Sequence, residues 1–146
     1  MPRYVVSACL AGQFCRYDGG SNPDPQVIRL VEQGLALPLC PEALSGLPCP
    51  RPPCEQRGDR VLCRGGTDVT WAFIQGAETA LALAREAGCR VAVLKARSPS
   101  CGVGHVYDGT FSKRLVPGDG LWAARLRAAG LIVHTEETFI LEESHG

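Results

Sequence analysis

The chain has 146 residues, of which 45% are hydrophobic and 21% are charged, and Lys plus Arg equals Asp plus Glu at 15 each. A chain of this length suits one domain that buries about 68–70% of its unfolded surface, so we expect a single domain over residues 1–146. The composition excludes a disordered or low-complexity chain. The sequence has no basic run and no aromatic-rich basic patch, so we expect a small-molecule partner, not a nucleic acid or a membrane.

The amino-terminal segment has no long apolar stretch, and no apolar run approaches the ~18 residues needed to span a bilayer. We therefore expect a cytoplasmic protein. The chain contains eight cysteines. In a reducing compartment so many thiols indicate metal binding or catalysis, not a disulfide framework.

The first forty residues predict a strand, a helix and a second strand. The first strand covers 3–7 and is followed directly by Cys9. Pro25 opens a helix whose apolar stripe ends at Gly34. The second strand covers 35–39 and ends at Cys40.

The segment 43–66 is rich in Gly, Pro and Arg and has no sustained periodicity, so we interpret it as a surface insertion, with a short hairpin arm over 60–64. The later patterns predict a helix from Thr67 or Asp68 to near Gly88, a strand over 90–95, a helix over 121–129 and a last strand over 131–134.

Alternation of strands and helices predicts an α/β domain, a Rossmann-like open sheet of about four parallel strands with helices on both faces. In such sheets ligands bind outside the carboxyl ends of the strands. Cys9, Cys40 and Cys101 each follow a predicted strand. Although far apart in the sequence, these three thiols are expected to meet at one edge of the sheet.

The segment 95–104 is the densest in reactive groups and follows the clearest buried strand. Pro99 fixes φ, and Gly102 and Gly104 let the backbone approach a bulky group closely. The loop can therefore present the Cys101 thiol and two serine hydroxyls to one point.

Three convergent thiols without a local histidine favour zinc or an iron–sulfur cluster. A tetrahedral zinc site usually needs a fourth ligand. A cubane held by three cysteines leaves one iron open to substrate as a Lewis acid. The alternative is three independent buried cysteines that pack as small hydrophobic side chains.

Several short motifs then occur in a fixed order. They are Val-Ser-Ala-Cys-Leu-Ala-Gly (6–12), Cys-Arg-Tyr-Asp-Gly (15–19), Cys-Pro-Glu (40–42), Pro-Arg-x-Pro (50–53), Asp-Val-Thr (68–70), Gly-Ala-Glu (76–78), Ser-Pro-Ser-Cys-Gly (98–102) and Tyr-Asp-Gly-Thr-Phe (107–111). With these motifs the chain resembles the small iron–sulfur proteins that include the thiouracil desulfidases.

The resemblance implies a [4Fe-4S] cluster on Cys9, Cys40 and Cys101 with its fourth iron open. It also implies Glu42 and Ser98 as the catalytic acid and hydroxyl. The implied activity is non-redox desulfidation of a thiocarbonyl compound such as thiouracil. The open iron would bind the sulfur of the substrate, Glu42 would activate water, and Ser98 would orient the substrate or relay a proton.

Two positions depart from the expected pattern. Ser45-Gly46-Leu47 follows the Cys-Pro-Glu motif where Gly-Gly-Leu is expected, and Lys113 stands where Gly is expected. Both are expected near the mouth of the site, so they bear on the identity of the substrate more than on the chemistry.

The remaining cysteines have weaker signals. Cys15 is a fourth ligand, a sulfur relay or a packed thiol, and we favour a thiol that packs in the interior or contacts the ligands without binding the metal. Cys49, Cys54 and Cys63 form no C-x-x-C pair, so a surface location without function is favoured over a zinc site. Cys89 precedes a strand at the opposite edge and is expected to pack in the core.

Three other side chains have weaker functional signals. His105 follows the central loop closely enough to reach a substrate. Arg16 and Arg51 suit an anionic substrate, although exposed arginines are usually only solvated.

Two other functions stay open. One is a cluster-binding or zinc-binding sensor without catalysis, in which Glu42 and Ser98 would have no role. The other is a nucleophilic cysteine enzyme, although no cysteine has an evident histidine base nearby in the sequence.

Overall fold

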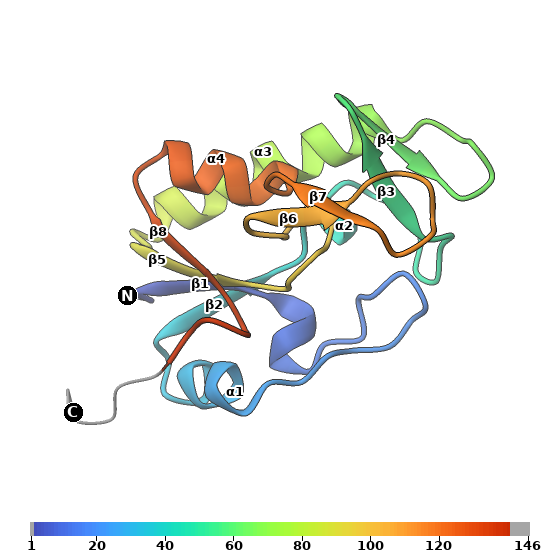
Figure 1. Cartoon of the computed structure of the whole chain (residues 1–146). Helices are drawn as coiled ribbons and strands as arrows, with labels where there is room; N and C mark the ends of the chain where they lie inside the picture. The colour runs from blue at the N-terminus through green and yellow to red at the C-terminus, as the bar shows by residue number, and fades with distance from the viewer. Residues whose placement is uncertain (1, 141–146) are drawn as a thin grey trace.

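The computed structural model describes residues 2–140, which form a parallel sheet with helices on both faces (Figure 1). The strands are β1 (Tyr4–Ser7), β2 (Ala36–Leu39), β5 (Val91–Leu94) and β8 (Ile132–Thr135), in the order β2-β1-β5-β8. All three neighbouring pairs are parallel. The predicted Rossmann-like α/β sheet of about four strands is confirmed.

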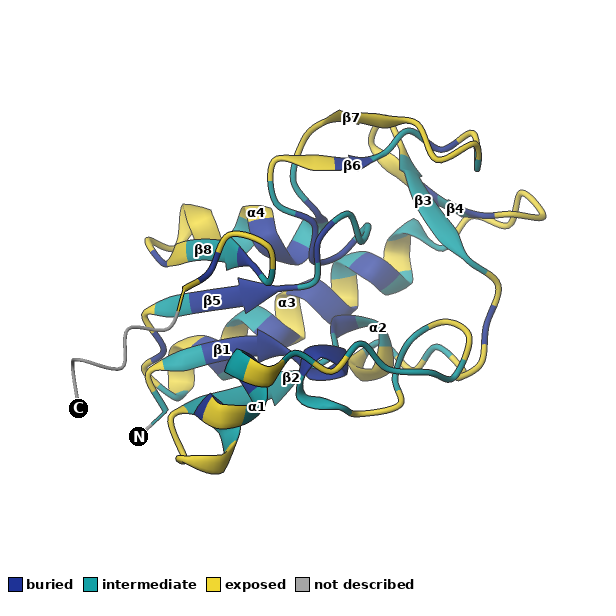
Figure 2. Ribbon diagram, turned by 60° about the horizontal axis from the view of Figure 1, so that its bottom comes forward, coloured by how far each residue is buried: buried dark blue, intermediate teal, exposed yellow. Residues whose placement is uncertain are grey.

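Helix α1 (Pro25–Glu32) covers one face of the sheet, and α3 (Thr70–Glu86) and α4 (Leu121–Ala128) cover the other. Successive strand residues point to opposite faces. In β1, Val5 therefore packs in the core under α3 and α4, and Val6 packs in the core beside α1. Figure 2 shows β1, β5 and the facing side of α3 as buried. Burial on both faces explains why β5 is continuously apolar.

The predicted limits of α1 are close to the observed ones because both ends carry local signals. The Asp24 carboxylate accepts hydrogen bonds from the backbone N–H groups of Gln26 and Val27 at the start of the helix. Gly34 adopts a left-handed φ of +74° just after its end, a conformation that glycine adopts without strain.

The short helix α2 (Pro41–Leu44) packs closely against α3. A Cβ atom on Gly76 of α3 would lie 2.0 Å from the backbone oxygen of Pro41. Only glycine permits this approach. Gly76 therefore sets the position of the segment that carries Cys40 and Glu42.

The segment 43–66, interpreted above as a surface insertion, is regularly folded over part of its length, and the hairpin arm predicted over 60–64 coincides with the strand Arg60–Cys63. The segment contains α2 and an antiparallel hairpin of β3 (Cys54–Arg57) and β4 (Arg60–Cys63), and it buries Val61 and Arg51. The Gln56 amide donates hydrogen bonds to the backbone oxygens of Pro99 and Asp119. Strand β3 has the sequence Cys-Glu-Gln-Arg, without the apolar run that marks a strand such as Val91–Leu94, and its hydrogen-bond partners Pro99 and Asp119 are distant in the sequence.

A second hairpin, β6 (His105–Tyr107) and β7 (Leu115–Pro117), was also not predicted. It lies beside β3 (Figure 1). The Glu55 carboxylate on β3 accepts hydrogen bonds from the backbone N–H groups of Gly109 and Phe111. The two hairpins thus cover the carboxyl edge of the sheet together. Within residues 2–140 no helix is both long enough and apolar enough to span a bilayer.

Candidate functional site

A cavity of about 640 Å³ opens at the carboxyl ends of β1, β2 and β5. The chain passes from β1 to β2 on one side and reaches β5 on the other, so this edge is the switch point where such sheets bind ligands. The cavity is lined by all five predicted site residues, namely Cys9, Cys40, Glu42, Ser98 and Cys101.

Each thiol is placed by the element that follows its strand. Cys9 lies in the 3-10 helix η1 (Ala8–Ala11) directly after β1, and Cys40 is the residue between β2 and α2. Cys101 lies in the loop after β5. Cys9 and Cys101 are buried, and Cys40 is partly buried.

The loop around Cys101 is fixed by Ser98. Its hydroxyl oxygen accepts hydrogen bonds from the backbone N–H groups of Ser100 at 3.2 Å and Cys101 at 3.1 Å. A Cβ on Gly120 would lie 2.3 Å from the carbonyl carbon of Ser100, so the next segment packs directly on this loop. The hydrogen bonds to Ser98 and the packing of Gly120 thus fix the position of the loop and of Cys101.

The Cys15 thiol interacts with the thiols of Cys40 and Cys9, and Cys40 Sγ donates to the Cys15 backbone oxygen at 3.9 Å. The hydrogen bond from Cys15 is the largest cause that lowers the pKa of Cys9, and it lowers the pKa of Cys40 to about 7. The same contacts raise the pKa of Cys15, which stays protonated as their donor. Burial raises the pKa of the Cys101 thiol. Cys15 therefore favours the thiolate form of two of the three cysteines.

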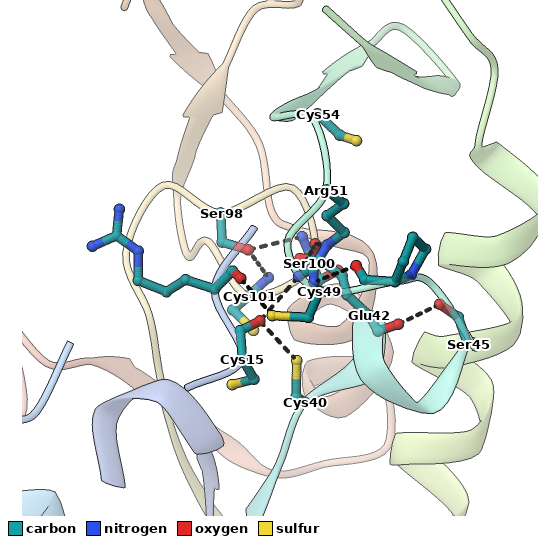
Figure 3. A network of polar contacts seen from close by, with 12 residues as sticks. Cys15, Cys40, Glu42, Ser45, Cys49, Arg51, Cys54, Ser98, Ser100 and Cys101 are labelled. Carbon is teal, nitrogen blue, oxygen red and sulfur yellow. Dashed lines mark hydrogen bonds and ion pairs between the residues drawn. The ribbon is translucent and has the colours of Figure 1, made fainter. Parts of the chain in front are cut away.

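Glu42 forms an ion pair with Arg51, which lies in the segment between α2 and β3 (Figure 3). Both Nη2 and Nε of Arg51 donate to Oε1 of Glu42, at 2.8 and 3.1 Å. Arg51 Nη2 also donates to the Cys15 backbone oxygen. The expectation that Arg51 is an exposed, solvated arginine is wrong, because its side chain is 5% exposed. The Pro-Arg-x-Pro motif was the sequence feature that could have indicated a role for Arg51 in the site.

The other two polar candidates differ in their positions. Arg16 lines the cavity and pairs with Asn22 and Asp18. His105 is exposed at the start of β6 and does not line the cavity. The hypothesis that His105 reaches a substrate is therefore not supported.

Three non-glycine residues of the cavity wall have left-handed backbone conformations. They are Arg97, Phe111 and Lys113, with φ of 68°, 57° and 63°. Such conformations are unfavourable for side chains other than glycine and cluster at functional sites. The left-handed φ of Lys113 explains why glycine is expected there. Lys113 adds a cationic side chain to the cavity wall.

The predicted surface location holds for Cys49, which is exposed. It does not hold for Cys54 and Cys63. Cys54 lines the cavity and Cys63 is buried, and their sulfur atoms are 3.0 Å apart. Cys89 is buried in the core below α3 and α4, which confirms the packing prediction.

The donor set fits an iron–sulfur cluster. Cys9, Cys40 and Cys101 provide three thiols on one largely buried wall, and two of them have lowered pKa values. In residues 2–140 no three Cys, His, Asp or Glu side chains converge as ligands of a single metal ion. The cysteines of a cubane bind separate irons, so they need not converge on one ion.

Fold and site together define a small α/β domain with a thiol-lined cavity at the carboxyl edge of a parallel sheet. The 2-thiouracil desulfurase family model matches residues 4–138, and the chain belongs to this family. It is 38% identical to the uncharacterized protein YbbK of Bacillus subtilis (strain 168) over 142 residues, 90% of this chain and 94% of YbbK.

A solved structure is also similar. The [4Fe-4S]-dependent thiouracil desulfidase TudS is 44% identical and superposes with a TM-score of 0.89, over 95% of this chain and 93% of TudS.

Proposed function

We propose that this chain is a [4Fe-4S]-dependent, non-redox desulfidase that removes sulfur from a thiocarbonyl compound such as thiouracil. The observation that carries the proposal is the shared cavity of Cys9, Cys40 and Cys101 with Glu42 and Ser98. Family membership and the similarity to TudS support it. In the overall reaction the oxygen of water replaces sulfur, C=S plus H₂O giving C=O plus H₂S, and no electrons are exchanged.

Cys9, Cys40 and Cys101 would hold the cluster. When bound, it supplies an iron without a protein thiolate, a Lewis acid that withdraws electrons from the thiocarbonyl group and makes its carbon electrophilic. Cys15 would keep its one thiol proton and donate it in a hydrogen bond to Cys9 or Cys40.

Glu42 would take a proton from the attacking water. Both hydrogen bonds from Arg51 reach Oε1, so the carboxylate is fixed while Oε2 can accept that proton. The same oxygen can later return the proton to the departing sulfide. Arg51 therefore orients the group that moves the proton.

Ser98 would orient the substrate. Its oxygen already accepts two backbone hydrogen bonds, which directs its own O–H proton to another acceptor. A carbonyl or ring nitrogen of the substrate is such an acceptor. The two hairpins that cover the cavity would limit access of bulk water.

The test is an anaerobic assay of sulfide release by the cluster-loaded protein from a panel of thiolated nucleobases. Formation of the oxo product with one sulfide per turnover is expected, and the cluster-free protein is the control. A loaded protein that binds the panel but releases no sulfide would favour the sensor function. In that case Glu42 and Ser98 would have no catalytic role.

A further inference from the structure

The pair Cys54 and Cys63 on the β3–β4 hairpin has no part in the proposed reaction. The two residues are direct cross-strand partners, and their sulfur atoms are 3.0 Å apart. Both are free thiols. Cys54 lies on the cavity wall and Cys63 is buried behind it.

The backbone at this pair has the geometry that a disulfide needs. The Cys63 N–H donates to the Thr67 oxygen and the Arg64 N–H to the Pro53 oxygen, so Cys54 and Cys63 occupy a non-hydrogen-bonded position of the ladder. At such positions the Cα atoms are about 4.5 Å apart and the side chains are close. This separation lies within the range of about 4.4–6.8 Å seen for disulfides.

Formation of the S–S bond, about 2.05 Å long, moves the two sulfur atoms by only about 1 Å. We propose that Cys54 and Cys63 form a redox-active dithiol on the cavity wall, which a low-molecular-weight disulfide converts reversibly into an intrachain disulfide. This site is independent of the cluster and of the proposed desulfidase activity.

The exchange has two steps. The sulfur of Cys54, the less buried residue of the pair, attacks one sulfur of the external disulfide RSSR, forms Cys54–S–S–R and releases one RSH. The Cys63 sulfur then attacks Cys54 Sγ and displaces the second RSH. The two thiol protons leave on the two RSH molecules, the cysteine sulfurs are oxidised by two electrons, and RSSR is reduced by two.

Burial raises the pKa of the Cys54 thiol. Cys54 is therefore kept as a thiol at neutral pH and reacts more slowly than an exposed thiolate. The disulfide would fix β3, the strand whose Glu55 and Gln56 side chains hold the loops over the cavity.

The test treats the reduced, cluster-loaded protein with oxidised glutathione without oxygen, then quenches it in acid and alkylates it with N-ethylmaleimide. Peptide mapping is expected to show one new peptide pair that joins Cys54 to Cys63, with two fewer alkylated thiols of the eight, and reversal by dithiothreitol. Pairing of Cys54 with Cys15 or Cys49, or Cys54 and Cys63 both alkylated at every glutathione ratio, would overturn the proposal.

Two variants identify the order of attack. Cys63→Ser is expected to trap glutathione on Cys54, and Cys54→Ser is expected to leave the buried Cys63 unmodified. Glutathione on Cys63 in Cys54→Ser would contradict this order. Cys89→Ser is the matched control, because Cys89 is equally buried but donates only to backbone oxygens. The Cys89→Ser protein should form the Cys54–Cys63 disulfide as the wild-type chain does. The peptide map of the unmodified chain decides the proposal even if a variant fails to fold.

Discussion

The guanidinium of Arg51 binds the Glu42 carboxylate through two hydrogen bonds to the same oxygen, with side chains that are only 5% and 15% exposed. The same guanidinium reaches the backbone oxygens of Cys15 and Pro48. Arg51 thus joins the proposed catalytic acid to the loop that carries the hydrogen-bond donor of two thiols. The Pro-rich segment between α2 and β3 is part of the site through this one side chain.

Arg51→Met is expected to lower the free energy of unfolding by about 3 kcal/mol, because it leaves the Glu42 carboxylate without its partner in a largely buried place. Urea unfolding of the cluster-free protein measures the loss. Arg60→Met is the control, since the pair of Arg60 with Asp68 is exposed. Its effect is expected to be within measurement error. Equal losses in the two variants would contradict a structural role of the buried pair.

Glu42→Gln keeps the shape of the side chain but cannot take a proton from water. The variant is expected to hold its cluster and bind the thiolated substrate, with turnover lower by about 10²–10⁴-fold. Sulfide release and iron content, measured on the same sample, separate chemistry from assembly. Near-normal turnover with an intact cluster would exclude Glu42 as the base.

The sheet and its three long helices could be predicted because their signals are local. The run Val91–Leu94 is apolar throughout, and Asp24 and Gly34 mark the ends of α1. The convergence of the three cysteines followed from strand topology alone. The pairing of Arg51 with Glu42 could not be predicted, because it depends on how an irregular segment folds back onto a four-residue helix.

The hairpin arm predicted over 60–64 coincides with β4, whereas β3, β6 and β7 were not predicted. Strand β3 (Cys-Glu-Gln-Arg) lacks the continuous apolar run that marks β5, and β6 has only three residues. Their stabilisation comes from side chains such as Gln56 and Glu55, which bind backbone groups more than forty residues away. The sequence gives no local signal for such contacts.

Serine replacement of Cys9, Cys40 or Cys101 is expected to abolish cluster assembly, because each removes one of three thiolate ligands. The unmodified protein, reconstituted without oxygen, should contain roughly four iron and four sulfide per chain. Iron and sulfide analysis with the visible absorption spectrum provides the measurement. Serine replacement of four other cysteines should leave the cluster intact. They are Cys49, Cys54, Cys63 and Cys89. Stoichiometric zinc without iron would refute the cluster.

In the cluster-free protein, the Cys40 thiol should be alkylated with a pH midpoint near 7, well below its ordinary pKa of 9.0. The largest cause of the lowered Cys40 pKa is hydrogen bonding to Cys15, so Cys15→Ala should move the midpoint upward. The pKa of Cys40 is lower in the folded protein than in the unfolded chain. Ionisation of Cys40 therefore adds to the free energy of unfolding above pH 9, and this contribution is lost as the pH falls through about 7. Iodoacetamide rates at the Cys40 peptide provide the measurement. An unchanged midpoint in Cys15→Ala would show that Cys15 does not stabilise the thiolate.

Gly76→Ala should destabilise the protein although alanine favours a helix by about 1 kcal/mol over glycine. The new Cβ would lie 2.0 Å from the Pro41 oxygen, so α2 or α3 must shift, and overpacking of this kind typically costs about 1–3 kcal/mol. Because α2 follows Cys40 and carries Glu42, iron content should fall together with stability. Gly65→Ala is the matched control, since nothing lies within 4 Å of its added Cβ and its φ is not left-handed. A Gly76→Ala protein with full stability and a full cluster would mean that the contact between α2 and α3 does not set the position of Cys40.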